Sequence, residues 1–354
     1  MDASAAALLA VPDAREVLLT SEDRRRLWEH LLLMRTVEDE GIKLYKKGKI
    51  PGSFYDGRGQ EAISVGAAFA LSAQDPICSP LIRDLGAHLV RGTDLTELFR
   101  HYMGRENALS RGREGNVHFG DRHLGVVGMV SMLPDMVVVA VGLAMAFAMR
   151  GEARCALTFF GDGATSRGDW HEALNWAAID RLPVVFVLED NHLAYSTPQS
   201  RQFATHPADR AEAYGIAVER VDGNDVEAVH AAVAGARERC LAGEGPVLVC
   251  ATTMRMHGHG AHDDARYVDP ELLDAWRARD PLERYRVVAA EHGVDVEAVE
   301  RDVRAAVDAA VAEALTTPMA DAATLMDGVF CEGEAEPLGV GGAAPWSAYD
   351  EGAR

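Results

Sequence analysis

The strongest constraint on the fold is an alternation of short apolar runs with helical segments between residues 155 and 253. The runs CALTFF (155–160), LPVVFVLE (182–189), AVERVD (217–222) and GPVLVCATT (245–253) have the length of buried strands. DWHEALNWAAI (169–179), between the first two runs, has its apolar residues at helical spacing. Strands that alternate with helices form parallel sheets covered on both faces. The pattern therefore predicts an α/β fold with a doubly wound, mostly parallel sheet flanked by helices.

The flanking sequence predicts further helices and two loose ends. A helix is expected from Ser21, which offers a cap, through residues 22–47, and a small-residue helix over 61–71. The loop 110–128 is long for a compact domain and is therefore expected to be functional. We predict a flexible N-terminal segment (1–20), one domain (21–330) and a flexible tail (331–354). The domain should end in one long amphipathic helix, stopped by Pro318, with apolar positions Val296, Val299, Val303, Val307, Val311 and Leu315.

Charge and cysteine usage restrict the class of protein. The formal charge of −20 argues against nucleic acid or an anionic membrane surface as a partner, since both attract basic patches. The five cysteines are scattered, which fits a reducing compartment. No basic residue precedes the short apolar stretch near the start, and no apolar run approaches the ~20 residues of a membrane span. We expect a cytoplasmic protein.

The segment FFGDGATSRGD (159–169) places Asp162 between two glycines directly after a predicted strand. Glycines there usually let a backbone approach a phosphate, but Asp162 would repel one, and Ser166 stands where a dinucleotide motif needs its third glycine. A cation between carboxylate and phosphate removes the conflict, and Mg²⁺ takes about six oxygen ligands of these kinds. Asn191 follows the next predicted strand and supplies a second oxygen at the same sheet edge. A plain turn is the alternative for the glycines and Asp162 alone.

The central segment GDGATSRGDWHEALNWAAIDRLPVVFVLEDNHLAYSTP (161–198) resembles the thiamine-diphosphate motif of the alpha subunits of 2-oxo-acid dehydrogenases. These are the decarboxylating components of the pyruvate, branched-chain oxo-acid and acetoin complexes, and the similarity extends from about Leu27 to about Leu325. The resemblance implies that Mg²⁺ is bound by Asp162, Asn191 and the backbone carbonyl of Leu193. Asp190 stands where the family has an asparagine. For the diphosphate, the resemblance implies contacts from Gly161, Gly163 and Ala164.

Two more segments resemble the family's cofactor-binding stretches. PLIRDLGAH (80–88) resembles the one whose arginine binds the diphosphate, which makes Arg83 that residue; Ile82 stands where the family often has a tyrosine. By itself, Arg83 could instead form a surface ion pair with Asp84. GVVGMVSMLPD (125–135) resembles the segment whose backbone holds the aminopyrimidine ring, at Ser131 and Leu133.

The resemblance also implies catalytic and substrate residues. GREGNVHFGD (112–121) resembles a loop with an active-site histidine, His118, and Tyr55 stands where the family places a substrate-pocket residue. MRMHGHGAHDD (254–264) resembles a mobile loop whose second histidine lies in the active site, which makes His259 a catalytic and cofactor-binding residue. Gly260 stands where mammalian relatives have a phosphorylated serine. Read without the family, this loop could be a transition-metal site formed by His257, His259, His262 and Asp263.

The resemblance implies that the chain decarboxylates a pyruvate-like or branched-chain 2-oxo acid and passes the acyl group to a lipoyl acyltransferase component. Thiamine diphosphate enzymes also need a glutamate at the pyrimidine ring, and we find no candidate for it. We therefore expect a separate beta subunit, in an α₂β₂ assembly. One alternative is a carboligase subunit that transfers the acyl group to an aldehyde or ketone. The other, of a different class, is a non-catalytic metal-binding scaffold.

Overall fold

The computed structural model describes residues 19–330 and 333. The flexible segments predicted at 1–20 and 331–354 lie outside the described residues, apart from Leu19, Thr20 and Gly333. In the part of the chain that is described, no helix is both long enough and apolar enough to span a bilayer.

The core is a six-stranded sheet in the order β2-β1-β3-β4-β8-β7, and every neighbouring pair is parallel. All four predicted strands are present, which confirms the α/β class. The predicted third strand is the edge strand β7 and is only partly buried, because it has a neighbour on one side alone. The strands of this sheet are β1 (Ile77–Cys78), β2 (Val126–Val127), β3 (Ala156–Gly161), β4 (Val184–Asp190), β7 (Ala217–Asp222) and β8 (Val247–Thr252). A separate antiparallel pair consists of β5 (Leu193–Ala194) and β6 (Thr197–Pro198).

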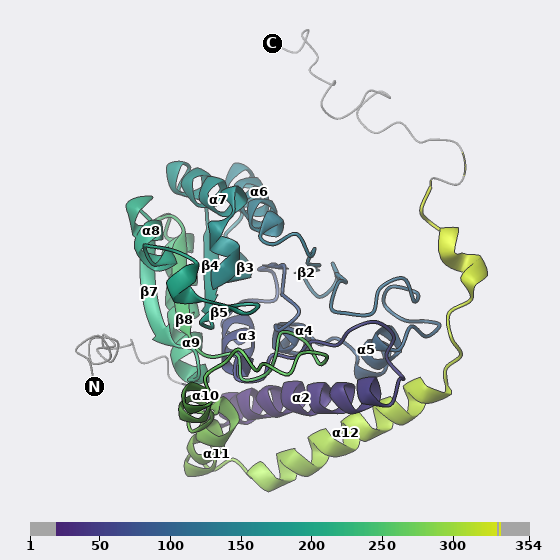
Figure 1. Ribbon diagram of the computed structural model, residues 1–354. Coiled ribbons are helices and arrows are strands. Elements are labelled where there is room, and N and C mark those ends of the chain that lie inside the picture. The colour runs from purple at the N-terminus through teal and green to yellow at the C-terminus, as the bar shows by residue number, and fades with distance from the viewer. Residues whose placement is uncertain (1–18, 331–332, 334–354) are drawn as a thin grey trace.

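Helices cover both faces of the sheet, and alternate strand residues pack against each layer (Figure 1). In β4, Val184, Phe186 and Leu188 face α6 (Asp135–Arg150), α7 (Gly168–Ile179) and α8 (Pro207–Ala213). Val185 and Val187 face α3 (Glu61–Phe69) and α9 (Val226–Leu241). This alternation explains why a strand that is buried on both faces reads as a continuous apolar run. The remaining helices are α2 (Ser21–Lys46), α4 (Leu85–Val90), α5 (Leu95–Tyr102), α10 (Pro270–Arg277), α11 (Pro281–Glu291) and α12 (Val296–Thr316).

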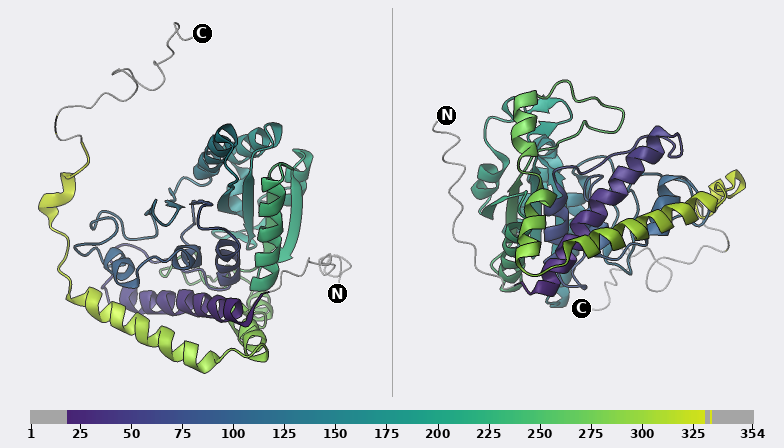
Figure 2. Two further views of the ribbon diagram at one scale, coloured as in Figure 1. Left: turned by 180° about the vertical axis from the view of Figure 1, so that it is seen from behind. Right: turned by 90° about the horizontal axis from the view of Figure 1, so that it is seen from below.

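The long helices α2 and α12 lie side by side outside the sheet layers (Figures 1 and 2). The predicted apolar stripe of α12 faces this contact: Val296, Val299, Val303, Val307 and Val311 all belong to one core cluster with residues of α2. Leu315 is the exception, since it is 38% exposed. The predicted cap of α2 is wrong by one position. Thr20, not Ser21, is the N-cap and forms a capping box with Asp23.

The histidine of α4 gives a prediction for stability against pH. His88 is fully buried, neither of its ring nitrogens has a partner among the described residues, and burial lowers its pKa to about 3. Between that value and the ordinary ~6.5 the unfolded chain binds a proton that the folded chain does not, so stability falls as pH falls. From pH 6.5 to 4 we expect a loss of roughly 3 kcal/mol from this residue.

Urea unfolding between pH 4 and pH 7 measures this effect. His88→Leu should flatten the dependence of the unfolding free energy on pH, whereas the same change at the exposed His292 should not. An unaltered slope in His88→Leu would contradict the assignment.

Candidate active site

A cavity of about 600 Å³ opens at the carboxyl ends of β3 and β4, the edge where open α/β sheets bind ligands. Its wall contains ten of the twelve predicted site residues; the exceptions are Tyr55 and His118. The predicted crossover between β3 and β4 therefore brings the two halves of the motif together. Those ten residues are Arg83, Ser131, Leu133, Gly161, Asp162, Gly163, Ala164, Asn191, Leu193 and His259.

One corner of the cavity contains the predicted metal ligands. Asp162 follows β3 directly and is 1% exposed. Its Oδ1 accepts from the Gly163 N–H at 2.8 Å, and its Oδ2 accepts from the Gln202 amide at 3.1 Å. Burial, and then the neighbouring Asp190, raise the pKa of Asp162. A cation beside these two carboxylates would relieve both effects.

The glycines of the motif have different local roles. A side chain at Gly161 would meet no atom within 4 Å, so the backbone there borders open space. A Cβ at Gly163 would lie 2.5 Å from that of Ala194, so this glycine is required by close packing. After Gly161 the chain forms a 3₁₀ turn, η1 (Asp162–Ser166), and α7 begins only at Gly168.

A second corner of the cavity is cationic. Arg83 and Arg255 are 6% and 2% exposed, and neither forms an ion pair with any carboxylate that the structure describes. Arg83 donates instead to the backbone carbonyls of Asp56 and His259, each at 2.7 Å. Burial, and then Arg255, lower the pKa of Arg83 to about 10. Buried guanidinium groups without a counterion favour binding of an anion.

Sequence reasoning missed Arg255 and gave a wrong alternative for Arg83. Arg255 follows β8 by three residues, so its position at the carboxyl edge of a predicted strand was a usable signal. The alternative of a surface ion pair between Arg83 and Asp84 is wrong, because both residues are buried and Asp84 contacts Glu189 instead. Burial, and then Glu189, raise the pKa of Asp84 well above its ordinary value.

The loop that follows β8 brings His259 to the cavity but does not form the alternative transition-metal site. Nδ1 of His257 lies 3.0 Å from a carboxylate oxygen of Asp56, and the ring of His262 packs edge-on to Tyr55. In the part of the chain that the structure describes, the ligand atoms of these histidines and of Asp263 do not converge on one point. The transition-metal reading is therefore wrong for this arrangement.

The tautomer of His259 follows from its neighbour. Nη2 of Arg83 lies 3.3 Å from Nδ1 of His259, and a guanidinium only donates, so Nδ1 accepts and Nε2 carries the proton. Burial, followed by Arg83 and Arg255, lowers the pKa of His259 to about 4, which keeps the ring neutral at pH 7. Its ring packs against the rings of Tyr195 and Tyr55, with centroid distances of 4.4 Å and 5.4 Å. Tyr55 therefore contacts the predicted catalytic histidine without reaching the cavity wall.

His118 lies next to the cavity wall. Its Nε2 is 2.6 Å from the hydroxyl of Ser131, which lines the cavity. Through this contact, the long loop 105–125 packs against the segment that is predicted to hold the aminopyrimidine ring. Ile82, which stands where the family often has a tyrosine, also lines the cavity, so the wall is apolar at this position.

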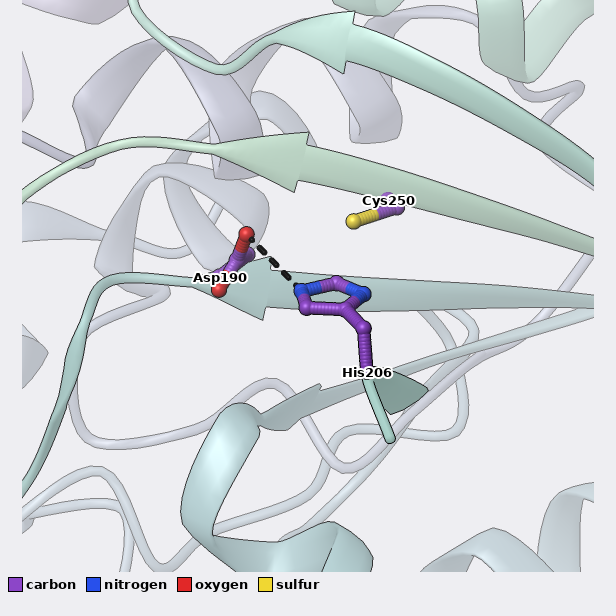
Figure 3. Close-up of side chains that lie close together, drawn as sticks. All are labelled: Asp190, His206 and Cys250. Atoms are coloured by element: carbon purple, nitrogen blue, oxygen red, sulfur yellow. Dashed lines mark ion pairs between the residues drawn. The ribbon is translucent and has the colours of Figure 1, made fainter. Parts of the chain in front are cut away.

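The departure at Asp190 has a structural partner, His206 (Figure 3). Nε2 of His206 lies 3.4 Å from Oδ2 of Asp190, and Cys250 is close enough that the three could be read as a metal site. However, Nδ1 of His206 accepts from the N–H of Ala208 at 3.2 Å, so Nε2 carries the proton that faces Asp190. Burial opposes ionisation of Asp190, but hydrogen bonding to His206 holds its pKa below the usual range. We interpret the group as a hydrogen-bonded pair beside a core cysteine.

The cavity thus fits a divalent cation together with a diphosphate. The buried Asp162 carboxylate and the Asn191 amide offer oxygen ligands at adjacent strand ends. The unpaired Arg83 and Arg255 offer donors to an anion, and the backbone beside Gly161 is open.

Comparison with known proteins identifies the family. The family described as "Dehydrogenase E1 component" matches residues 29–323. The chain is 34% identical over 321 residues to the 2-oxoisovalerate dehydrogenase subunit alpha of Bacillus subtilis, covering 89% of this chain and 97% of that protein. It is 33% identical over 328 residues to the pyruvate dehydrogenase E1 component subunit alpha-1 of Oryza sativa, covering 91% and 83%.

A third relative is longer than this chain. The mitochondrial 2-oxoisovalerate dehydrogenase subunit alpha 2 of Arabidopsis thaliana is 34% identical over 309 residues, which are 86% of this chain and 65% of that protein, just under two thirds of its length. The residues that match the family model include all six strands of the main sheet, the residues that line the cavity and most of the helices. The chain therefore belongs to the dehydrogenase E1 component family, as an alpha subunit of the 2-oxo-acid dehydrogenase type.

Proposed function

We propose that the chain, with Mg²⁺ and thiamine diphosphate, decarboxylates a pyruvate-like or branched-chain 2-oxo acid and passes the acyl group to a lipoyl acyltransferase component. The observation that carries this proposal is the shared cavity of Asp162, Asn191 and Arg83. Two oxygen ligands at adjacent strand ends face a buried guanidinium that has no carboxylate partner among the described residues. A metal bridged to a diphosphate is the ligand class that this combination fits.

Different residues of the cavity would bind the metal and the diphosphate. Asp162, Asn191 and the carbonyl of Leu193 would hold Mg²⁺, while Arg83 and Arg255 would hold the diphosphate. When bound, the cofactor would supply a carbon nucleophile and an electron sink for the decarboxylation of the 2-oxo acid. The backbone at Ser131 and Leu133 would orient the pyrimidine ring, and Gly161, Gly163 and Ala164 would lie along the diphosphate.

His259 is suited to donate a hydrogen bond at neutral pH. Its ring is neutral and its proton is on Nε2, because Nδ1 accepts from Arg83. A neutral donor in a half-buried site stabilises a developing negative charge on a substrate oxygen. His118, through Ser131, is the second candidate for such a role.

The chain needs a partner to complete the site. Glu189 is the one glutamate on the cavity wall among the described residues; it is buried, and its Oε1 already accepts from Gln60 at 3.1 Å. It is therefore not free to contact a pyrimidine nitrogen. We propose that a beta subunit supplies the glutamate that contacts the pyrimidine ring, in an α₂β₂ assembly.

The test is CO₂ release from a panel of 2-oxo acids by the chain co-expressed with a beta-type subunit from a neighbouring gene. Each acid is tested with thiamine diphosphate and an artificial electron acceptor, with and without Mg²⁺. We expect Mg²⁺-dependent turnover of a pyruvate-like or branched-chain acid. Turnover that requires an added aldehyde would indicate the carboligase instead, and a stable complex that binds cofactor but turns over no acid would indicate the scaffold.

A further inference from the structure

The orientation of the Asn191 amide decides whether this residue can bind a cation. Only the oxygen of an amide can be a ligand, whereas its nitrogen repels cations. We infer that Gln60 is a positioning residue that holds Asn191 with Oδ1 available to the metal. This inference rests on the metal site of the proposed function, and it concerns a residue to which neither the sequence motif nor the family resemblance gave a role.

Gln60 lies at the N-terminus of α3, far in sequence from the motif, and is fully buried. Its Oε1 accepts from Nδ2 of Asn191 at 3.0 Å. Its Nε2 donates to Oε1 of Glu189 at 3.1 Å. The side chain of Gln60 thus bridges Glu189, which lies in β4, and Asn191, which follows the last residue of that strand.

These contacts permit only one orientation of both amides. Glu189 presents an acceptor to Gln60, so Nε2 of Gln60 must face it and Oε1 must face Asn191. The N–H of Leu193 imposes the same orientation from the other side, because it donates to Oδ1 of Asn191 at 3.2 Å. A flipped Asn191 would set nitrogen against N–H and oxygen against oxygen. The remaining lone pair of Oδ1 is then the one that can reach a cation.

A buried amide can also serve packing alone, and the two roles differ in one measurable respect. If Gln60 acts through Asn191, its removal costs metal affinity only while Asn191 has an amide to orient. If Gln60 serves packing, its effect is independent of the residue at position 191. A double-mutant cycle separates the two cases.

The experiment measures Mn²⁺ binding, as a probe for the Mg²⁺ site, to the complex with the beta subunit and thiamine diphosphate, by calorimetry. Gln60→Met keeps the length of the side chain and removes both hydrogen bonds. We expect about 10- to 100-fold weaker Mn²⁺ binding, the usual cost of losing a group that orients a ligand. In an Asn191→Ser background, which keeps an oxygen but no amide, Gln60→Met should have no further effect.

Asn224→Met is the matched control, because Asn224 is an equally buried amide that bonds Thr253 and Arg279 rather than Asn191. It should leave Mn²⁺ affinity unchanged. If Gln60→Met does not fold, Gln60→Asn shortens the amide by one methylene so that it cannot reach both partners, and the same loss is expected.

Equal losses in both backgrounds, or none in either, would overturn the positioning role. Failure of the wild-type complex to bind Mn²⁺ at all would instead overturn the proposed metal site, so the two failures are distinguishable.

Discussion

Asp162→Asn should abolish metal-dependent cofactor binding and at the same time make the metal-free protein more stable. The carboxylate is 1% exposed and its pKa is raised by burial and by Asp190, so its charge opposes folding when no cation is present. An amide of the same shape removes that charge. Loss of a direct carboxylate ligand should weaken metal binding by more than the ~100-fold attributed to groups that only orient ligands.

The local hydrogen bonds can accommodate this change. Oδ1 of Asp162 accepts from Gly163, and the new amide can keep that bond. Its NH₂ group would face Nε2 of Gln202 and Nε2 of Gln199, which both donate to Oδ2 of Asp162. It can donate to Oε1 of Gln202 once that amide turns over, which breaks the bond from Nε2 of Gln202 to the carbonyl of the exposed Thr197. The group that loses its partner is the carbonyl of an exposed residue, which water can reach, so the gain in stability from removing the buried charge should be visible.

Thermal unfolding without metal and Mg²⁺-dependent binding of thiamine diphosphate measure the two effects. Asp169→Asn is the matched control, because Asp169 belongs to the same segment but forms a partly exposed ion pair with Arg167. It should change neither quantity in this way. An Asp162→Asn protein that binds cofactor with unchanged Mg²⁺ dependence would refute the metal site.

The sheet could be predicted because its central strands are buried on both faces and stand out as apolar runs. The helix α6 could not: its sequence DMVVVAVGLAMAFAMR is apolar nearly all round, so it has no helical stripe to detect. The short helix α4 and the short strands β1 and β2 offer too few residues for any period. The order of strands in the sheet depends on contacts distant in sequence, which a local pattern does not contain.

The same limit applies to the site. Asp162 and Asn191 could be paired from the sequence because one strand-helix-strand step separates them, and such steps have a fixed geometry. Gln60 contacts Asn191 from another part of the chain, and Arg255 reaches the cavity from β8. No local signal connects Gln60 to the motif. The partners of Asp84 were mistaken for the same reason, since Glu189 lies far along the chain.

Arg83→Met should weaken the binding of thiamine diphosphate by at least about 100-fold, and Arg83→Lys by roughly 10- to 100-fold, since hydrogen bonds to charged groups contribute about 1.5–3 kcal/mol each. Arg83 uses Nη1 and Nη2 to hold Asp56 and His259. Its Nε–H and one hydrogen of Nη1 have no acceptor among the described residues and remain for an anion. A lysine has the charge but cannot reach the loop carbonyls and the anion together.

Ligands with and without phosphate groups show whether the loss of affinity in the Arg83 variants comes from a lost contact with the diphosphate. If Arg83 contacts the diphosphate, competition by inorganic diphosphate should weaken by a similar factor, whereas binding of thiamine without phosphates should change little. If Arg83 only holds the His259 loop, the loss for thiamine should equal that for the full cofactor, which would refute the contact.

Arg91→Met is the matched control for this change. Arg91 also donates to two backbone carbonyls, of Ser72 and Asp75, and burial lowers its pKa as it does that of Arg83. It lies away from the cavity, so its removal should lower the unfolding temperature without changing cofactor affinity. The difference between the Arg83 and Arg91 variants in cofactor affinity measures the contribution of Arg83 to binding in the cavity. A buried guanidinium that only ties down backbone contributes to folding, while one that keeps free N–H groups at a cavity contributes to binding.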